Sequence, residues 1–282
     1  HRRPRDRPED GRRRAVNVFM PATIDEAVAA MAVDAPPTPI AGGTDLLVSW
    51  NEHAHERAPS YLDLSGVEGL RRIVWTDEAV VLGALSTYWD VAQDARLCDE
   101  LPLLERAARQ VGAVQIQTRG TWAGNIANGS PAADGVPVLM AYDAEVVLSS
   151  VRGERSVPLE SYYTGYRASV KAPDELITAI VIPHRARTRH HYEKVGSRAA
   201  QAITKVGFAL VRDEQSRHRV CANSVAATVR RCPAVEAVFD SDDVTLHNLR
   251  VAVAQDVDPI DDLRSTRAYR HEVLARTLAA LG

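Results

Sequence analysis

Cysteines, familiar nucleotide-binding motifs and long apolar runs are scarce or absent in this sequence, and each shortage excludes a class of protein. The three cysteines, Cys98, Cys221 and Cys232, lack C-x-x-C spacing, so this chain alone cannot supply a four-cysteine iron–sulfur cluster or zinc site. Their small, odd number predicts a reduced compartment. No apolar run approaches membrane-spanning length and no signal-peptide core is visible, so we expect a cytoplasmic protein without a membrane span.

The sequence contains neither G-x-x-x-x-G-K-[ST] nor a G-x-G-x-x-G that follows a strand, so we expect neither a P-loop nor a standard Rossmann site. Its formal net charge of -3 over 282 residues argues against nucleic acid as the main partner, which would favour a basic face. The histidines at 53, 55, 184, 190 and 191 lack the i, i+4 spacing of ligands on one helical face. We therefore interpret them as solvated side chains and predict no metal site.

Two short glycine-bearing segments are the most informative feature that is present. They read Ala-Gly-Gly-Thr-Asp at 41–45 and Gly-Thr-Trp-Ala-Gly-Asn at 120–125, and each follows an apolar stretch. Glycine lets successive backbone N–H groups turn toward one point, which makes an anion-binding concavity without a cationic side chain. Two such segments could grip the two phosphates of a dinucleotide, although each is also compatible with an ordinary strand-ending turn.

The rest of the chain, 45% hydrophobic and 25% charged, predicts one large or two modest globular domains. Residues 1–14 carry seven arginines and almost nothing apolar, which predicts a disordered basic tail. Thr23 and Glu26 form a capping-box pattern that predicts a helix through Met31. Further helices are expected from Pro102 to Val111, at 136–142 and at the end of the chain, where Tyr269, Val273, Leu274 and Leu278 share one face. Strands are expected at 61–64, 79–82, 145–148, 174–183, 206–211 and 220–229.

A series of short segments in a fixed order carries a resemblance to a known family. The segments are Pro39–Val48, Gly83–Thr87, Gln115–Asn125, Ser130–Asp134, Asp174–Ile177, Ile182–Pro183, Lys194–Arg198, Asp261–Ser265 and Tyr269–Arg270. Together they resemble the FAD-binding medium subunit of the molybdenum hydroxylase family, which contains carbon monoxide dehydrogenase and the flavin part of xanthine dehydrogenase. Each segment alone is weak, but the ordered set is specific and covers nearly all of the chain beyond the tail.

The resemblance implies an α+β fold. After the tail at 1–14, a two-subdomain α/β FAD-binding domain of the PCMH type is expected over 15–187. A smaller α+β C-terminal domain, like that of carbon monoxide dehydrogenase flavoproteins, is expected over 188–282. The boundary lies in the polar, arginine-rich stretch 184–191.

The resemblance also implies which residues hold FAD. These are Ala41, Gly42, Gly43, Thr44, Asp45, Leu46, Thr121, Ala123, Gly124, Asn125, Asp134, Tyr192 and Lys194. The glycine segments would hold the pyrophosphate, and Thr44, Thr121 and Asn125 would add side-chain hydrogen bonds. Asp134 corresponds to the family's acidic contact on the adenosine side, with a helix cap as its alternative role. Lys194 would lie near the flavin ring and Tyr192 would stack on it, with core and rim positions as their alternatives.

One position departs from the family pattern. The family segment usually reads Thr-apolar-Gly-Gly-Asn, whereas Ala123 replaces the first of those glycines here. Alanine keeps the backbone donor but disfavours positive φ, so the segment is unstrained only if Ala123 is helical or extended. Trp122 fills the apolar position and would shape the segment or contact a partner chain.

The implied function is electron transfer, without a catalytic acid, base or nucleophile in this chain. A molybdopterin-binding large subunit would oxidise the substrate, and a small subunit with [2Fe–2S] clusters would carry electrons to FAD. The final acceptor would be NAD, a quinone or dioxygen. Two alternatives remain open: a stand-alone FAD-dependent oxidoreductase, and a non-catalytic scaffold that keeps the fold, to which Ala123 lends slight support.

Overall fold

The structure, a computed structural model, describes residues 16–50, 59–241 and 243–282; the predicted tail at 1–14 and the histidines at 53 and 55 lie outside this range. The described chain begins with a small parallel sheet in the order β1 (Asn17–Phe19), β3 (Ser60–Asp63), β2 (Thr38–Ile40). The first glycine segment follows β2 directly and leads into the short helix α2 (Leu46–Trp50).

The predicted first helix is confirmed as α1 (Ile24–Met31). The hydroxyl of Thr23 accepts the backbone N–H of Glu26 at 3.1 Å, as an N-cap residue does. The Glu26 carboxylate, however, accepts the N–H of Ala22 at 2.7 Å instead of that of Thr23, so the capping box is shifted by one donor.

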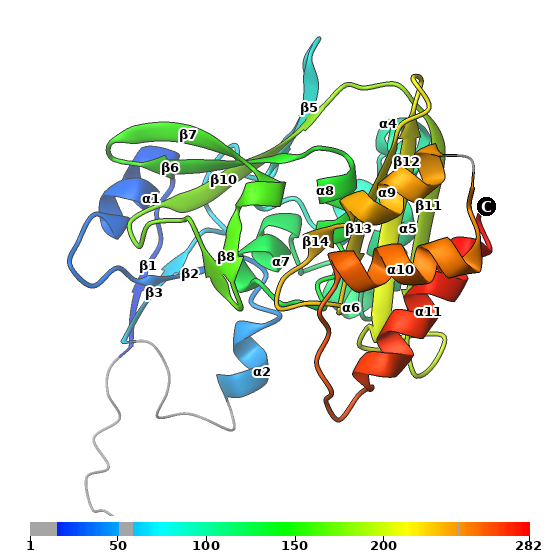
Figure 1. The fold of residues 1–282 in the computed structure, drawn as a ribbon. Coiled ribbons are helices and arrows are strands. Elements are labelled where there is room, and N and C mark those ends of the chain that lie inside the picture. The colour runs from blue at the N-terminus through cyan, green and yellow to red at the C-terminus, as the bar shows by residue number, and fades with distance from the viewer. Residues whose placement is uncertain (1–15, 51–58, 242) are drawn as a thin grey trace, which may run out of the picture.

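A five-stranded antiparallel sheet forms the centre of the molecule (Figure 1). Its order is β4 (Ile73–Trp75), β5 (Ala79–Gly83), β10 (Leu176–Pro183), β6 (Glu145–Ser150), β7 (Gly153–Pro158). Between β5 and β6 the chain forms α3 (Tyr88–Gln93), α4 (Ala95–Glu100), α5 (Pro102–Gln110), α6 (Val114–Gln117), α7 (Trp122–Asn128) and α8 (Val136–Ala141). After β7 come the 3-10 turn η2 (Leu159–Ser161) and the hairpin β8 (Tyr163–Gly165) and β9 (Ala168–Ser169). The apolar stretch before the second glycine segment is therefore helix α6, and that segment begins helix α7 rather than ending a strand.

The last third forms a four-stranded antiparallel sheet in the order β11 (Arg187–Val195), β12 (Val206–Asp213), β13 (His218–Asn223), β14 (Arg230–Arg231). Helices α9 (Pro233–Asp240), α10 (Leu246–Asp256) and α11 (Arg267–Ala279) follow and pack on one face of it, while α5 and α8 pack on the other (Figure 1). Successive side chains of β12 point to opposite faces of this sheet. Phe208 therefore belongs to the core under α9–α11, and Ala209 belongs to the central core. The predicted mixture of helices and strands is confirmed.

Helix α11 corrects one expectation about packing. Its buried face contains Leu274 and Leu278, as predicted, but the Tyr269 side chain is 42% exposed. Arg270 is buried in its place, at 5% exposure, where it donates to the carbonyl of Ser224 at 2.6 Å and to Asp262 at 2.7 Å. The apolar pattern missed this position because an arginine can be buried once its donors find acceptors.

Candidate functional site

The two glycine segments, 78 positions apart in the sequence, lie in direct backbone contact. A Cβ atom added to Gly42 would be 1.7 Å from the carbonyl oxygen of Arg119, so only glycine permits this approach. A Cβ on Gly120 would meet the Thr44 hydroxyl at 3.4 Å. Nearby, the amide of Asn128 donates to the Asp45 carboxylate at 3.0 Å, which joins the two segments through side chains as well.

The first segment presents unused backbone donors. Gly43 has a φ of +70°, the left-handed conformation that glycine adopts at little cost. Among the described residues, no acceptor pairs with the backbone N–H groups of Gly42, Gly43, Thr44 or Asp45. Consecutive free N–H groups in such a turn are the donors that bind anions.

A cavity of about 150 Å³ lies against these donors. Its lining comprises Ile40, Ala41, Gly42, Gly43, Leu46, Leu47, Asp63, Ser65 and Arg119. The Asp63 carboxylate, which would oppose an anion, already accepts the backbone N–H of Ser65 at 2.9 Å. The cavity accommodates one phosphate-sized group, with Arg119 at its border.

The second segment is the start of helix α7. Thr121 is its N-cap, and the Thr121 hydroxyl accepts the Gly124 N–H at 2.9 Å. A Cβ on Gly124 would lie 2.8 Å from that hydroxyl, so a larger residue there would force the Thr121 side chain out of its capping position. The Asn125 side-chain oxygen accepts the Gly135 N–H at 3.2 Å, so Thr121 and Asn125 use their side-chain oxygens within the chain.

Ala123 is accommodated without strain. It lies inside α7, 5% exposed, and it is not among the described residues with positive φ. The family's glycine at this position is therefore not needed for its conformational freedom. Trp122 is fully buried, with its ring centroid 4.9 Å from that of Tyr88, so it shapes the segment from within and offers no surface to a partner.

Asp134 and Lys194 form a buried ion pair. Lys194 Nζ lies 2.7 Å from Asp134 Oδ2 and also donates to the carbonyl of Gln110 at 2.7 Å, while the other Asp134 oxygen accepts the Thr204 hydroxyl. The Lys194 side chain is 7% exposed and the Asp134 side chain is 14% exposed. Asp134 is not a helix cap, because α8 begins after Gly135 with no side-chain cap. The pair ties β11 to the second glycine region and to the end of α5.

Tyr192 precedes Lys194 by two residues on β11, so their side chains lie on the same face of the strand. Its ring is 7% exposed and belongs to the central core. Burial, together with the nearby Asp134 carboxylate, raises the pKa of the Tyr192 phenol well above its ordinary value. The structure thus brings Asp134, Tyr192 and Lys194 together.

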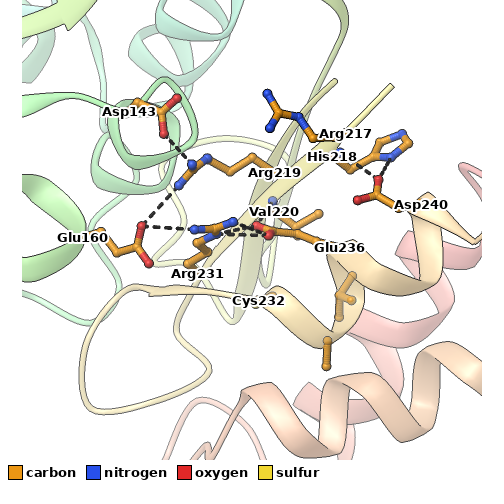
Figure 2. Close-up of polar contacts among 12 residues, drawn as sticks. Asp143, Glu160, Arg217, His218, Arg219, Val220, Arg231, Cys232, Glu236 and Asp240 are labelled. Carbon is orange, nitrogen blue, oxygen red and sulfur yellow. Dashed lines mark hydrogen bonds and ion pairs between the residues drawn. The ribbon is translucent and has the colours of Figure 1, made fainter. Parts of the chain in front are cut away.

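A cluster of charges without any local sequence motif joins the last sheet to the turns that precede β6 and follow β7. Figure 2 shows Arg219 of β13 between Asp143 and Glu160, at 2.7 and 3.2 Å, and Arg231 of β14 between Glu160 and Glu236. These residues are scattered over almost a hundred positions and form no local motif, so no sequence signal identifies them. Their partners within the chain make this cluster a structural junction.

Two of the histidines considered above, His184 and His190, pair with other protein groups. His184 Nε2 lies 3.0 Å from the carbonyl of Thr76, and His190 Nδ1 lies 3.0 Å from the Tyr142 hydroxyl. In the part of the chain that the structure describes, no group of three or more histidine, cysteine or carboxylate side chains has the arrangement of a metal site. No described helix is long and apolar enough to cross a bilayer.

The fold is that of a flavin subunit of a molybdenum-containing dehydrogenase. A chain of carbon monoxide dehydrogenase from Hydrogenophaga pseudoflava superimposes with a TM-score of 0.86 at 26% identity, covering 94% of this chain and 95% of that one. The nicotinate dehydrogenase FAD-subunit of Eubacterium barkeri is 33% identical over 195 residues, 67% of this chain and 66% of that protein. The nicotine 6-hydroxylase medium subunit of Paenarthrobacter nicotinovorans is 27% identical and covers 95% of this chain and 98% of its own length.

Residues 14–185 match the family described as the FAD binding domain in molybdopterin dehydrogenase. The chain therefore belongs to this family, is a component of an oxidoreductase and has FAD as its cofactor. The resemblance to the medium subunits of molybdenum hydroxylases is confirmed.

Proposed function

We propose that this chain is the electron-transfer subunit of a molybdenum hydroxylase complex, in which electrons from [2Fe–2S] clusters pass through FAD to a final acceptor. Bound FAD supplies the redox chemistry, because its ring accepts and releases electrons one or two at a time. The observation that carries the proposal is the contact between the two glycine segments, with free N–H groups beside a phosphate-sized cavity.

The roles of this chain's own residues follow from that geometry. The free N–H groups of Gly42, Gly43, Thr44 and Asp45 bind the pyrophosphate, and Ala41 and Leu46 flank them. The start of α7 is held against the first glycine segment by Thr121, Ala123, Gly124 and Asn125. Asp134 fixes the Lys194 ammonium on the far side of the site, next to Tyr192.

The partners in this proposal are a molybdopterin-binding large subunit and a [2Fe–2S] small subunit. The names of the relatives support it, because they describe an FAD-subunit and a medium subunit, which are parts of larger assemblies. The final acceptor is NAD, a quinone or dioxygen. Three cysteines without a disulfide support a cytoplasmic location.

The two alternative functions differ from this one in measurable ways. A stand-alone FAD oxidoreductase would turn over a small substrate without companion subunits. A non-catalytic scaffold would not need a competent cofactor site. The helical conformation of Ala123 removes the one feature that favoured a scaffold.

A visible spectrum of the purified full-length chain tests the proposal, with any released cofactor identified after denaturation. We expect stoichiometric FAD, either as purified or after incubation with FAD. A chain that binds no FAD, alone or co-expressed with its partner subunits, would refute the proposal. A chain that binds FAD and oxidises a substrate by itself would favour the stand-alone oxidoreductase.

A further inference from the structure

Two buried tyrosines at the candidate site have hydroxyl groups without a protein partner. Tyr88 is 3% exposed and Tyr192 is 7% exposed, and neither hydroxyl forms a hydrogen bond with another described residue. Buried polar groups in proteins almost always have a partner, and an unpaired one costs free energy. Since neither phenol oxygen is fully enclosed, both are open to a partner from outside the protein.

Tyr88 lies against the second glycine segment. It is the first residue of α3, where the capping box of Thr87 and Asp90 fixes the helix start, and its backbone N–H donates to the Gly120 carbonyl at 3.1 Å. Its ring packs on Trp122 and lies so close to Gly120 that an added Cβ there would be 3.3 Å away. The ring thus packs against Trp122 and Gly120, while its hydroxyl bonds to no other described residue.

Tyr192 reaches the same region from β11. Lys194 lies on the same face of that strand, and its ammonium gives two of its three N–H groups to Asp134 and Gln110. Burial and the Asp134 carboxylate raise the pKa of both phenols, which keeps them neutral hydrogen-bonding groups at physiological pH. Asp134 thus lies within electrostatic range of both tyrosines.

Both hydroxyls also border accessible space. The described polar side-chain atoms that are fully enclosed and unpaired include Nε1 of Trp122, but neither phenol oxygen. Both phenol oxygens therefore keep some contact with solvent, whereas the Trp122 N–H is sealed.

We propose that the hydroxyls of Tyr88 and Tyr192 are hydrogen-bonding contacts for bound FAD, each bonding to the cofactor in place of solvent. This inference rests on the proposed function, and it adds Tyr88 to the residues that hold the cofactor. It also gives Tyr192 a polar role in addition to any stacking by its ring.

The test compares Tyr88→Phe and Tyr192→Phe with the unchanged chain in two measurements. Without FAD, urea unfolding of each variant should match the parent, because no hydrogen bond within the protein is lost. In a fluorescence titration, the dissociation constant for FAD should rise about fivefold for each variant and about 25-fold for the double variant, as expected for one and two lost hydrogen bonds.

Tyr142→Phe is the matched control. The Tyr142 hydroxyl accepts the Leu103 N–H at 3.1 Å and pairs with His190, so its removal should lower stability toward urea and leave FAD affinity unchanged. If the parent chain binds FAD but both site variants bind it equally well, the inference is wrong while the proposed function stands. If they lose stability like the control, their hydroxyls have protein partners and the inference is also wrong. A parent that never binds FAD refutes the proposed function instead.

Discussion

Replacing Gly42 with alanine is the most direct test of the contact between the two glycine segments. The new methyl group would lie 1.7 Å from the Arg119 carbonyl oxygen and 2.5 Å from its carbon. Because both neighbours are backbone atoms, the strain cannot be relieved by a side-chain rotation. The segments must separate by about 1.3 Å before that contact reaches 3.0 Å, the lower limit for real Cβ atoms.

We expect Gly42→Ala to lower the free energy of unfolding by about 1–3 kcal/mol, the usual cost of an overpacked position. The displacement also moves the free N–H groups that would bind the pyrophosphate. We therefore expect FAD affinity to fall by at least about tenfold, or about 1.4 kcal/mol. Urea unfolding of the FAD-free chain and a flavin fluorescence titration measure the two effects separately.

Gly165→Ala is the matched control, because its new methyl group meets nothing within 4 Å and its φ is not positive. This variant should unfold and bind FAD like the parent. The steric argument fails if Gly42→Ala does the same. If Gly42→Ala loses stability yet keeps full FAD affinity, the segments touch but do not form the pyrophosphate site.

Three further outcomes follow from the site and its surroundings. Gly124→Ala, whose methyl group would lie 2.8 Å from the Thr121 hydroxyl, should disrupt the N-cap of α7 and cost about 1 kcal/mol in urea unfolding; an unchanged midpoint would contradict this. Lys194→Met leaves a buried carboxylate unpaired and should cost about 3 kcal/mol, measured in the same way; a loss below about 1 kcal/mol would show that the pair is solvated. Burial lowers the pKa of His190 and His191 in the folded chain, so the unfolded chain binds more protons below about pH 6.5. The free energy of unfolding should therefore decrease from pH 7 to pH 5, and a flat profile over that window would contradict the burial.

Local features of the fold were predictable because they depend on residues close in sequence. The Thr23 cap and the helix that begins at Pro102 appear as predicted, and the strand expected at 174–183 is present at Leu176–Pro183. The second glycine segment was harder to interpret, since a short apolar run such as 114–116 fits a strand or a helix equally well. The structure shows a helix there, followed directly by the N-cap of α7.

The site itself depends on contacts that local patterns do not encode. The family resemblance selected Asp134 and Lys194 separately, but their pairing across 60 positions and the link to Thr204 are visible only in three dimensions. Tyr88 carried no signal, because a tyrosine after an N-cap is unremarkable until its ring is seen against Gly120 and Trp122 of the second glycine segment. The burial of Arg270 was missed because it depends on two acceptors, the distant Ser224 carbonyl and Asp262 in the loop before α11.

The arrangement of the last sheet explains why the candidate site needs both parts of the chain. Helices α9–α11 pack on one face of the sheet β11–β14. The other face packs against the central core through Tyr192 and Ala209. Lys194 lies on that second face and pairs with Asp134, so the ion pair forms only when the sheet is packed against the central core. A ligand that binds between the glycine segments and β11 must therefore stabilise that seating, because it binds the folded chain and not the unfolded one. The stability of the chain toward urea should therefore depend on the FAD concentration. The contact of this face that links the two is the Asp134–Lys194 ion pair.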